Sequence, residues 1–279
     1  MEIFRTLRRY RILRSTYLHG FVGGTSEKRF IERLGDLFHE GYLDRPNEQW
    51  RFADARYRPV VYELGRGGVE AAGIATEAES VTWFRHGPHR QFEHTLMVCE
   101  VLASIELTTR GRPDIRFISW PEILAKAPEA TRQSAKPYLL SADNGETVIP
   151  DAFFGLEYRH DGRKAYRFFA LEADRGTMPI ARSMNGTSSV LAKLRYYREL
   201  IKRDAHKLCL GIPNLLILLV TTNFGRCSEI TTNFHRVAGA CPEFLIGTAG
   251  DPTLRNQPVS DLLHMAWHRP GVEPIILDL

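Results

Sequence analysis

The 279-residue chain is long enough to bury a sizeable core and to form two modest domains. Its composition, 43% hydrophobic and 25% charged, is typical of an ordinary soluble protein and excludes a wholly disordered one, and its net charge of +4 permits a polyanionic partner without demanding one. The longest apolar run, LLILLV at 215–220, is far shorter than the ~20 residues of a membrane-spanning helix, so we expect no membrane segment.

The cysteines are scattered and form no CxxC pair. The N-terminus does not resemble a secretory signal peptide. We therefore expect a cytoplasmic protein with free thiols at Cys99, Cys209, Cys227 and Cys241.

Three helices are predicted in the first 40 residues. Apolar residues recur at helical spacing over 3–11, and a second short helix covers 15–22. The third helix begins after a cap at Thr25 or Ser26 and ends at Gly41.

Two short runs with strand character come next, QWRFA at 49–53 and RPVVYEL at 58–64. Three helices followed by a hairpin are typical of a winged helix-turn-helix, which we assign to residues 1–75. In that fold the third helix lies in the major groove of DNA and basic flanks contact phosphates. The predicted DNA-binding residues are Lys28, Arg29, Arg33, Arg51, Arg56 and Arg58.

The basic third helix also has a simpler interpretation as a solvated surface. Glu27, Glu32 and Asp36 lie on the same helix, so its local charge is only slightly positive. For the domain as a whole, the alternative to DNA binding is a protein-interaction module.

After the hairpin, the sequence is rich in Gly, Ala and charged residues and has weak periodicity, and we assign 76–89 as a linker. Residues 90–279 are predicted to form a mixed α+β domain. A loop is expected over 125–147. The other predicted elements are, in chain order, a helix at 90–111, strands at 114–120, 148–159 and 164–175, a helix at 189–207, a strand at 214–222, a helix at 225–239 and a strand at 243–248.

Three carboxylates interrupt the apolar runs of the predicted hairpin strands, where an unneutralised charge is costly. Glu172 and Asp174 are two residues apart and share a strand face, and Asp151 lies on the partner strand. Converging at one end of the sheet, they would suit Mg²⁺ or Mn²⁺. The alternative, exposed strand ends, is less favoured because the preceding YRFFALE run is apolar on both faces, as in a central strand.

These motifs resemble known families. The PD at 150–151, the hairpin and the acidic LEAD segment resemble the PD-(D/E)XK nuclease superfamily, which has an αβββαβ core, over roughly residues 90–250. More narrowly, a winged helix followed by PDA, LEADRGT and KLRYY resembles the plasmid replication-relaxation family over nearly the whole chain.

The resemblance implies metal-dependent cleavage of DNA, with Asp151 and Glu172 as metal ligands. Asp174 stands where the motif has Lys, and we expect it to contribute to the metal or its waters. The cation of the motif is therefore missing at this position, which argues against cleavage. Lys193 on the following helix, or Arg175, could replace it, and we favour Lys193 because a helix packed across the sheet can project a residue over the strand ends.

The superfamily often supplies a further acid from its first helix. Glu93 and Glu100 are the candidates there, and Glu122, which follows the next strand, is a third. For the first two the alternative is an ordinary solvent-facing Glu, and for Glu122 it is a helix cap.

Zinc is not expected, because His86, His89 and His94 have no Cys nearby to complete four ligands. No nucleotide is expected either, because HGFVGGTSEK lacks the GK[ST] ending of a P-loop.

The sequence therefore predicts a winged helix joined to a restriction-endonuclease-like domain, acting on double-stranded DNA in plasmid replication, relaxation or mobilisation. If active, it is an Mg²⁺-dependent endonuclease or nickase. The alternatives are a catalytically inactive DNA-binding accessory factor or regulator, favoured by Asp174, and a purely protein-binding adaptor. A homodimer would suit paired DNA half-sites, although no interface pattern is visible.

Overall fold

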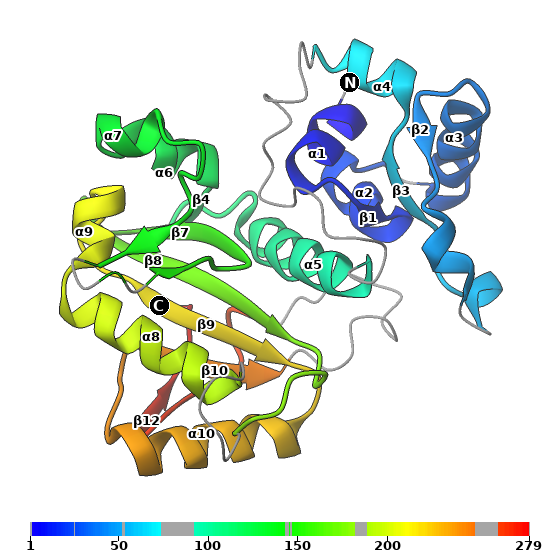
Figure 1. Cartoon of the computed structure of the whole chain (residues 1–279). Helices are drawn as coiled ribbons and strands as arrows, with labels where there is room; N and C mark the ends of the chain where they lie inside the picture. Colours follow the sequence, from blue (N-terminus) through cyan, green and yellow to red (C-terminus); the bar gives the residue numbers. More distant parts are fainter. Residues whose placement is uncertain are drawn as a thin grey trace. The chain divides into compact units, whose positions relative to one another are not determined.

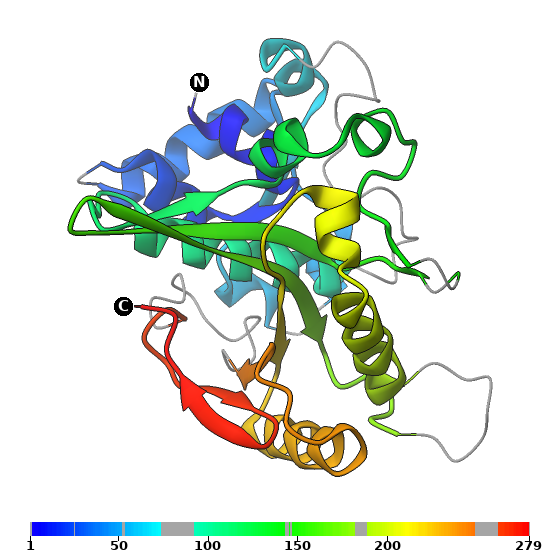
Figure 2. The ribbon, with the colours of Figure 1, turned by 90° about the vertical axis from the view of Figure 1, so that its left-hand side faces the viewer.

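The computed structural model describes residues 2–24, 26–51, 54–73, 92–142, 145, 147–181, 189–248 and 262–278 (Figure 1 and Figure 2). The chain forms two compact units, Met1–Leu107 with Asp251–Ser260, and Thr108–Gly250 with Asp261–Leu279. The division falls within the helix predicted at 90–111. The predicted linker, 76–89, lies outside the described residues.

The first unit places helices around a three-stranded antiparallel sheet of order β1-β3-β2. Its strands are β1 (Leu13–Arg14), β2 (Leu43–Asp44) and β3 (Val61–Leu64). Its helices are α1 (Glu2–Tyr10), α2 (Ser15–Val22), α3 (Glu27–His39), the 3₁₀ turns η1 (Asn47–Arg51) and η2 (Ala55–Tyr57), α4 (Arg66–Ala71), and α5 (Phe92–Thr109) as far as Leu107.

Local sequence signals explain α3. The Ser26 hydroxyl accepts a hydrogen bond from the Arg29 backbone N–H, which caps the helix as predicted. Phe30 and Leu34 are buried one helical turn apart. Gly41 follows the helix with φ +78°, a conformation that glycine adopts without steric cost.

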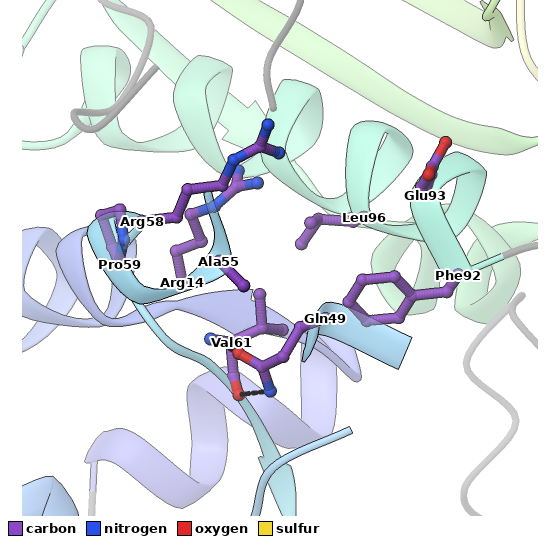
Figure 3. Close-up of a pocket in the computed structure, with 9 residues that line it drawn as sticks. All are labelled: Arg14, Gln49, Ala55, Arg58, Pro59, Val61, Phe92, Glu93 and Leu96. Carbon is purple, nitrogen blue, oxygen red and sulfur yellow. Dashed lines mark hydrogen bonds between the residues drawn. The ribbon is translucent and has the colours of Figure 1, made fainter. Parts of the chain in front are cut away.

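The predicted strand at 49–53 is wrong. The first strand of the hairpin is β2, and residues 47–51 form η1 instead. The reason is the buried side chain of Gln49, which binds the backbone of Val61 as a strand partner would (Figure 3). Its amide donates to the Val61 carbonyl at 3.0 Å and accepts from the Val61 N–H at 2.8 Å.

Buried polar contacts join α5 to the rest of the first unit. The side chains of Glu100 and Arg14 form an ion pair with only 1% and 3% of their surfaces exposed. One turn and a half further on, Glu106 accepts hydrogen bonds from Arg9 and Tyr10. The length of α5 from Glu100 to Glu106 therefore belongs to the core of this unit.

A seven-stranded mixed sheet of order β12-β11-β10-β9-β8-β7-β4 organises the second unit. Strands β4, β7 and β8 are antiparallel, whereas β8, β9 and β10 are parallel. The bounds are β4 (Ile115–Ile118), β7 (Ala152–His160), β8 (Arg163–Asp174), β9 (Leu216–Thr221), β10 (Phe244–Thr248), β11 (Trp267–Arg269) and β12 (Val272–Ile275).

The helices of the second unit are α6 (Trp120–Lys126), α7 (Glu129–Arg132), α8 (Val190–Lys202), α9 (Ala205–Leu210) and α10 (Phe224–Ala238). Helices α8 and α10 pack against each other (Figure 2). A small sheet pairs β5 (Leu140–Ser141) with β6 (Thr147–Val148).

The predicted β7–β8 hairpin is confirmed. His160 pairs with Arg163 across a two-residue turn in which Asp161 and Gly162 have φ of +48° and +74°. These positive φ angles are those that an Asp-Gly turn supplies. The hairpin holds β7 and β8 in register up to Ala152.

Two predictions for this unit need correction, and two of its strands were missed. The predicted loop at 125–147 contains α7 and β5, and the predicted helix at 189–207 is two helices, because Asp204 has φ +54° and interrupts it. Strands β11 and β12 were not predicted.

All four cysteines lie in the described part of the chain and are free thiols. Among the described residues, none of the helices combines the length and the apolar character needed to cross a bilayer.

Candidate functional site

The predicted acidic residues lie at the ends of β7 and β8. Asp151 directly precedes β7, and its backbone N–H donates to the Leu171 carbonyl of β8 at 3.0 Å. Its side-chain Oδ2 accepts from the Ala173 N–H at 2.8 Å. Asp151 is thereby held beside the last residues of β8, where Glu172 and Asp174 lie.

Two residues of α8 hold Glu172, which is 5% exposed. Lys193 Nζ donates to Glu172 Oε2, and the Tyr197 hydroxyl donates to Glu172 Oε1. Lys193 and Tyr197 are four residues apart and so lie on one face of the helix. The lysine predicted to replace the motif cation therefore contacts the predicted acid.

Burial and neighbouring charges shift the pKa values of this cluster. Burial raises the pKa of the Glu172 carboxyl to about 7, and the negative charge of Asp151 adds to the rise, while Lys193 and Tyr197 oppose it. Burial alone would lower the pKa of Lys193, but the charges of Glu172 and Asp151 raise it above its ordinary value. The cluster thus keeps a charged ammonium beside two crowded carboxylates.

Asp174 does not join this cluster. Arg226, in the first turn of α10, donates to Asp174 Oδ2 through Nε and to Oδ1 through its terminal nitrogen at 2.9 Å. The same guanidinium donates to the carbonyl of Met178. Asp174 is therefore neutralised by an arginine from another helix, and among the described residues the three carboxylates do not form a group placed to hold one metal ion.

The part of the chain that the structure describes contains no group of three His, Cys, Asp or Glu residues placed to hold a metal ion. Two carboxylates from neighbouring strands remain, Asp151 and Glu172. Mg²⁺ is often held by one or two protein carboxylates with waters and substrate phosphates completing its shell. The charge of Asp151 raises the pKa of Glu172, which shows that the two carboxylates repel each other. A hard cation bound between them would reduce this repulsion.

The three candidates for an additional acid have other contacts. Glu100 is buried with Arg14, and Glu122 caps α6 by accepting from the Ser119 N–H at 3.1 Å while pairing with Arg116. Glu93 lines a small cavity of about 20 Å³ within the first unit (Figure 3). Glu122 therefore has the alternative role, that of a helix cap. Glu100 is not the solvent-facing Glu of its alternative, because it is buried in an ion pair within the first unit.

The zinc prediction concerned His86, His89 and His94. His86 and His89 lie outside the described residues, and His94 is in the first turn of α5. The prediction that zinc is absent is therefore not tested.

A cleft of about 340 Å³ adjoins the cluster. Lys193, whose side chain is 32% exposed, lines the cleft and also contacts Glu172. Four residues of α8 or its cap form one wall, and the rest comes from the residue before β5, from β6 and the residue after it, and from the segment after β8. The lining residues are Leu139, Thr147, Val148, Ile149, Met178, Ser189, Ala192, Lys193 and Tyr196.

The predicted DNA-binding residues are mostly free to meet a partner. Those on the outer side of α3 and in the two 3₁₀ turns are exposed, namely Lys28, Arg29, Arg33, Arg51 and Arg56. Arg58 differs, because its side chain is 17% exposed and pairs with Asp54 at 2.9 Å.

Comparison with protein families gives a match to the replication-relaxation model over residues 4–214, which is more than half of the chain. The chain belongs to the replication-relaxation family. This family membership links it to plasmid replication or relaxation. The matched range contains Asp151, Glu172 and Lys193, and it ends before Arg226. No curated protein and no solved structure matches the chain significantly.

Sequence reasoning missed two residues that contact the predicted acids, Tyr197 at Glu172 and Arg226 at Asp174. Tyr197 is not among the predicted site residues, although its spacing of four from Lys193 could have indicated a shared contact. Arg226 has no comparable signal, because it is 52 residues from Asp174 in sequence and meets it only through the pairing of β8 with β9 and the turn into α10.

Titration of Glu172 leads to a prediction about stability. The unfolded carboxyl loses its proton near pH 4.5 and the folded one near pH 7, so the folded state binds the proton more tightly. The stabilisation from this group is full below pH 4.5 and is lost as the pH rises to 7, up to about 3 kcal/mol.

This prediction is checked by urea denaturation in EDTA from pH 4.5 to 8, comparing the wild type with Glu172→Gln. The free energy of unfolding of the wild type should fall relative to that of Glu172→Gln as the pH rises through that window, because the amide does not titrate. Parallel curves for the two proteins would contradict it.

Proposed function

We propose that this member of the replication-relaxation family binds duplex DNA through its first unit and nicks or cleaves it in a metal-dependent reaction at Asp151, Glu172 and Lys193. The observation that carries the proposal is the contact of Lys193 with Glu172 beside Asp151. It brings together two acids and one cation, the side-chain types that PD-(D/E)XK nucleases use, although the lysine comes from a helix.

The folds of the two units support this proposal. We interpret the first unit as a winged helix, because α1, α2 and α3 accompany a sheet of order β1-β3-β2. We interpret the second as a PD-(D/E)XK domain, because the three antiparallel strands β4, β7 and β8 are followed by α8 and by β9 parallel to β8.

In the proposed reaction, Asp151 and Glu172 would hold Mg²⁺ or Mn²⁺. When bound, the ion would lower the pKa of a water for attack on the phosphodiester and polarise the phosphate. Lys193 offsets negative charge at the phosphate, and Tyr197 fixes the rotamer of Glu172 by its hydrogen bond to Oε1. We place the reaction in the cytoplasm, with the chain acting alone or as a dimer on paired half-sites.

Supercoiled plasmid with Mg²⁺ or Mn²⁺ tests the nuclease. We expect metal-dependent nicking by the wild type and a loss of at least about 100-fold in Asp151→Ala, Glu172→Ala and Lys193→Met, because each removes a group that acts on the phosphate or its water. The matched control is Glu199→Ala, an exposed carboxylate on the same helix as Lys193, which should nick at the wild-type rate.

A second candidate function is a DNA-binding accessory factor without turnover. It is favoured by Asp174 at the motif lysine position and by its pairing with Arg226. Intact plasmid in the nicking assay, with salt-sensitive gel shifts of the same protein, would support this candidate and refute the nuclease.

The exposed basic residues of α3 predict how binding depends on salt. Replacing Lys28, Arg29 and Arg33 with Ala should weaken duplex binding and reduce the slope of log K against log salt by up to about 3, if each contacts a phosphate. The control replaces three exposed basic residues of the second unit, Arg132, Lys136 and Arg236. An unchanged slope in the α3 variant would exclude this helix from phosphate contact.

A further inference from the structure

We infer that the cleft beside Lys193 binds an unpaired nucleobase of the DNA strand on which the protein acts. The inference rests on the proposed function and adds to it a preference for single-stranded or locally melted DNA. The walls of the cleft, the charge at its edge and its size each support this occupant.

The walls of the cleft are mainly apolar. Tyr196 and Ile149, each 46% exposed, come from α8 and from the segment before β7, and Met178 and Leu139 extend the lining. A flat aromatic ring exposed in a cleft offers a stacking surface to any base, because every base has a π-face. Base-stacking contacts on Tyr, Phe and Trp are a common way in which proteins bind unpaired nucleotides.

The charge of the cleft suits the backbone that carries such a base. Lys193 is the cationic residue in the lining, and no Asp or Glu is among the described lining residues. The ammonium group lies against Glu172, so a phosphate that reached Lys193 would also reach the carboxylate pair. The nucleotide whose base enters the cleft would therefore be next to the phosphate that is attacked.

The dimensions of the cleft exclude a duplex. A volume of about 340 Å³ lies at the lower end of the range of about 300–1,000 Å³ for small-molecule sites. Such a site has room for the base of a single nucleotide. The base must leave the duplex stack to enter, which costs least in a strand that is already unpaired.

Binding of short oligonucleotides to the full chain tests the inference without requiring cleavage. In EDTA, fluorescence anisotropy would compare a labelled 12-residue thymidine oligonucleotide with an abasic strand of equal length and charge. We expect the wild type to bind the thymidine strand about tenfold more tightly, from base stacking. Tyr196→Ala should bring the ratio of the two affinities, thymidine strand to abasic strand, close to one. Tyr196→Phe should preserve this ratio, because the aromatic ring remains.

The matched control is Tyr166→Ala, which removes a partly exposed tyrosine from β8 of the same unit and should leave the ratio unchanged. Ala192→Leu, which fills the cleft from α8 without adding an aromatic ring, should lower the ratio as Tyr196→Ala does. Equal affinity of the wild type for both strands, or a ratio that Tyr196→Ala does not alter, would overturn the inference.

The nicking assay separates this inference from the proposed function. Nicking that depends on Asp151 but has the same KM and kcat in Tyr196→Ala would leave the nuclease standing and remove the base-binding cleft. Suppose instead that the protein binds the thymidine strand more tightly than the abasic strand only when Tyr196 is present, but never nicks DNA. The base-binding cleft would then stand and the nuclease would be refuted.

Discussion

Replacing Arg226 with Met is expected to lower the free energy of unfolding by about 3–5 kcal/mol, because it leaves the Asp174 carboxylate buried without its ionic partner. Asp174 is 8% exposed, so water cannot replace the guanidinium. The same substitution also removes a hydrogen bond to the carbonyl of Met178. Urea denaturation of the purified variant measures the effect.

Two further variants make the test specific. Arg236→Met removes an exposed arginine from the same helix and should cost less than about 0.5 kcal/mol. In Arg226→Met combined with Asp174→Asn, part of the stability should return, because the uncompensated charge is gone. A loss below 1 kcal/mol in the single variant would show that the ion pair does not stabilise the fold.

The function of Asp174 can be examined with the same proteins. If Asp174 is structural, Asp174→Asn lowers stability while nicking per folded molecule stays within a few-fold of the wild type. Loss of nicking in a fully folded Asp174→Asn protein would instead make Asp174 part of the reaction.

Replacing Glu100 with Leu is the second substitution with a large expected effect, about 3–5 kcal/mol in the first unit. The guanidinium of Arg14, 3% exposed, would lose the carboxylate that compensates its charge. A double variant with Arg14→Met and Glu100→Leu should recover most of the loss, since replacing a whole buried ion pair with apolar groups is often neutral or stabilising.

A surface ion pair in the same unit provides the comparison. Arg66 and Glu70 form an i,i+4 pair with side chains 95% and 70% exposed, and Glu70→Ala should cost less than about 0.5 kcal/mol. If Glu100→Leu lowers the free energy of unfolding by no more than this, the buried ion pair does not contribute much to stability. The stable double variant should also nick plasmid, which would exclude Glu100 as a catalytic acid.

Local patterns in the sequence determined several elements of this protein. The apolar spacing and the Ser26 cap fixed α3, and the Asp-Gly pair fixed the β7–β8 turn, because both depend on neighbours within a few residues. The same hairpin placed Asp151 beside Glu172, and helical reach brought Lys193 to it.

Only the tertiary structure decided the partners that lie far apart in the chain. The residue neutralising Asp174 is Arg226, and the one neutralising Glu100 is Arg14, choices that depend on which helix meets which strand. Gln49 likewise replaced a predicted strand by binding the backbone of Val61. The physical reason is that propensity and periodicity act over a few residues, whereas a buried charge or amide takes whichever partner the packed fold brings within hydrogen-bond distance.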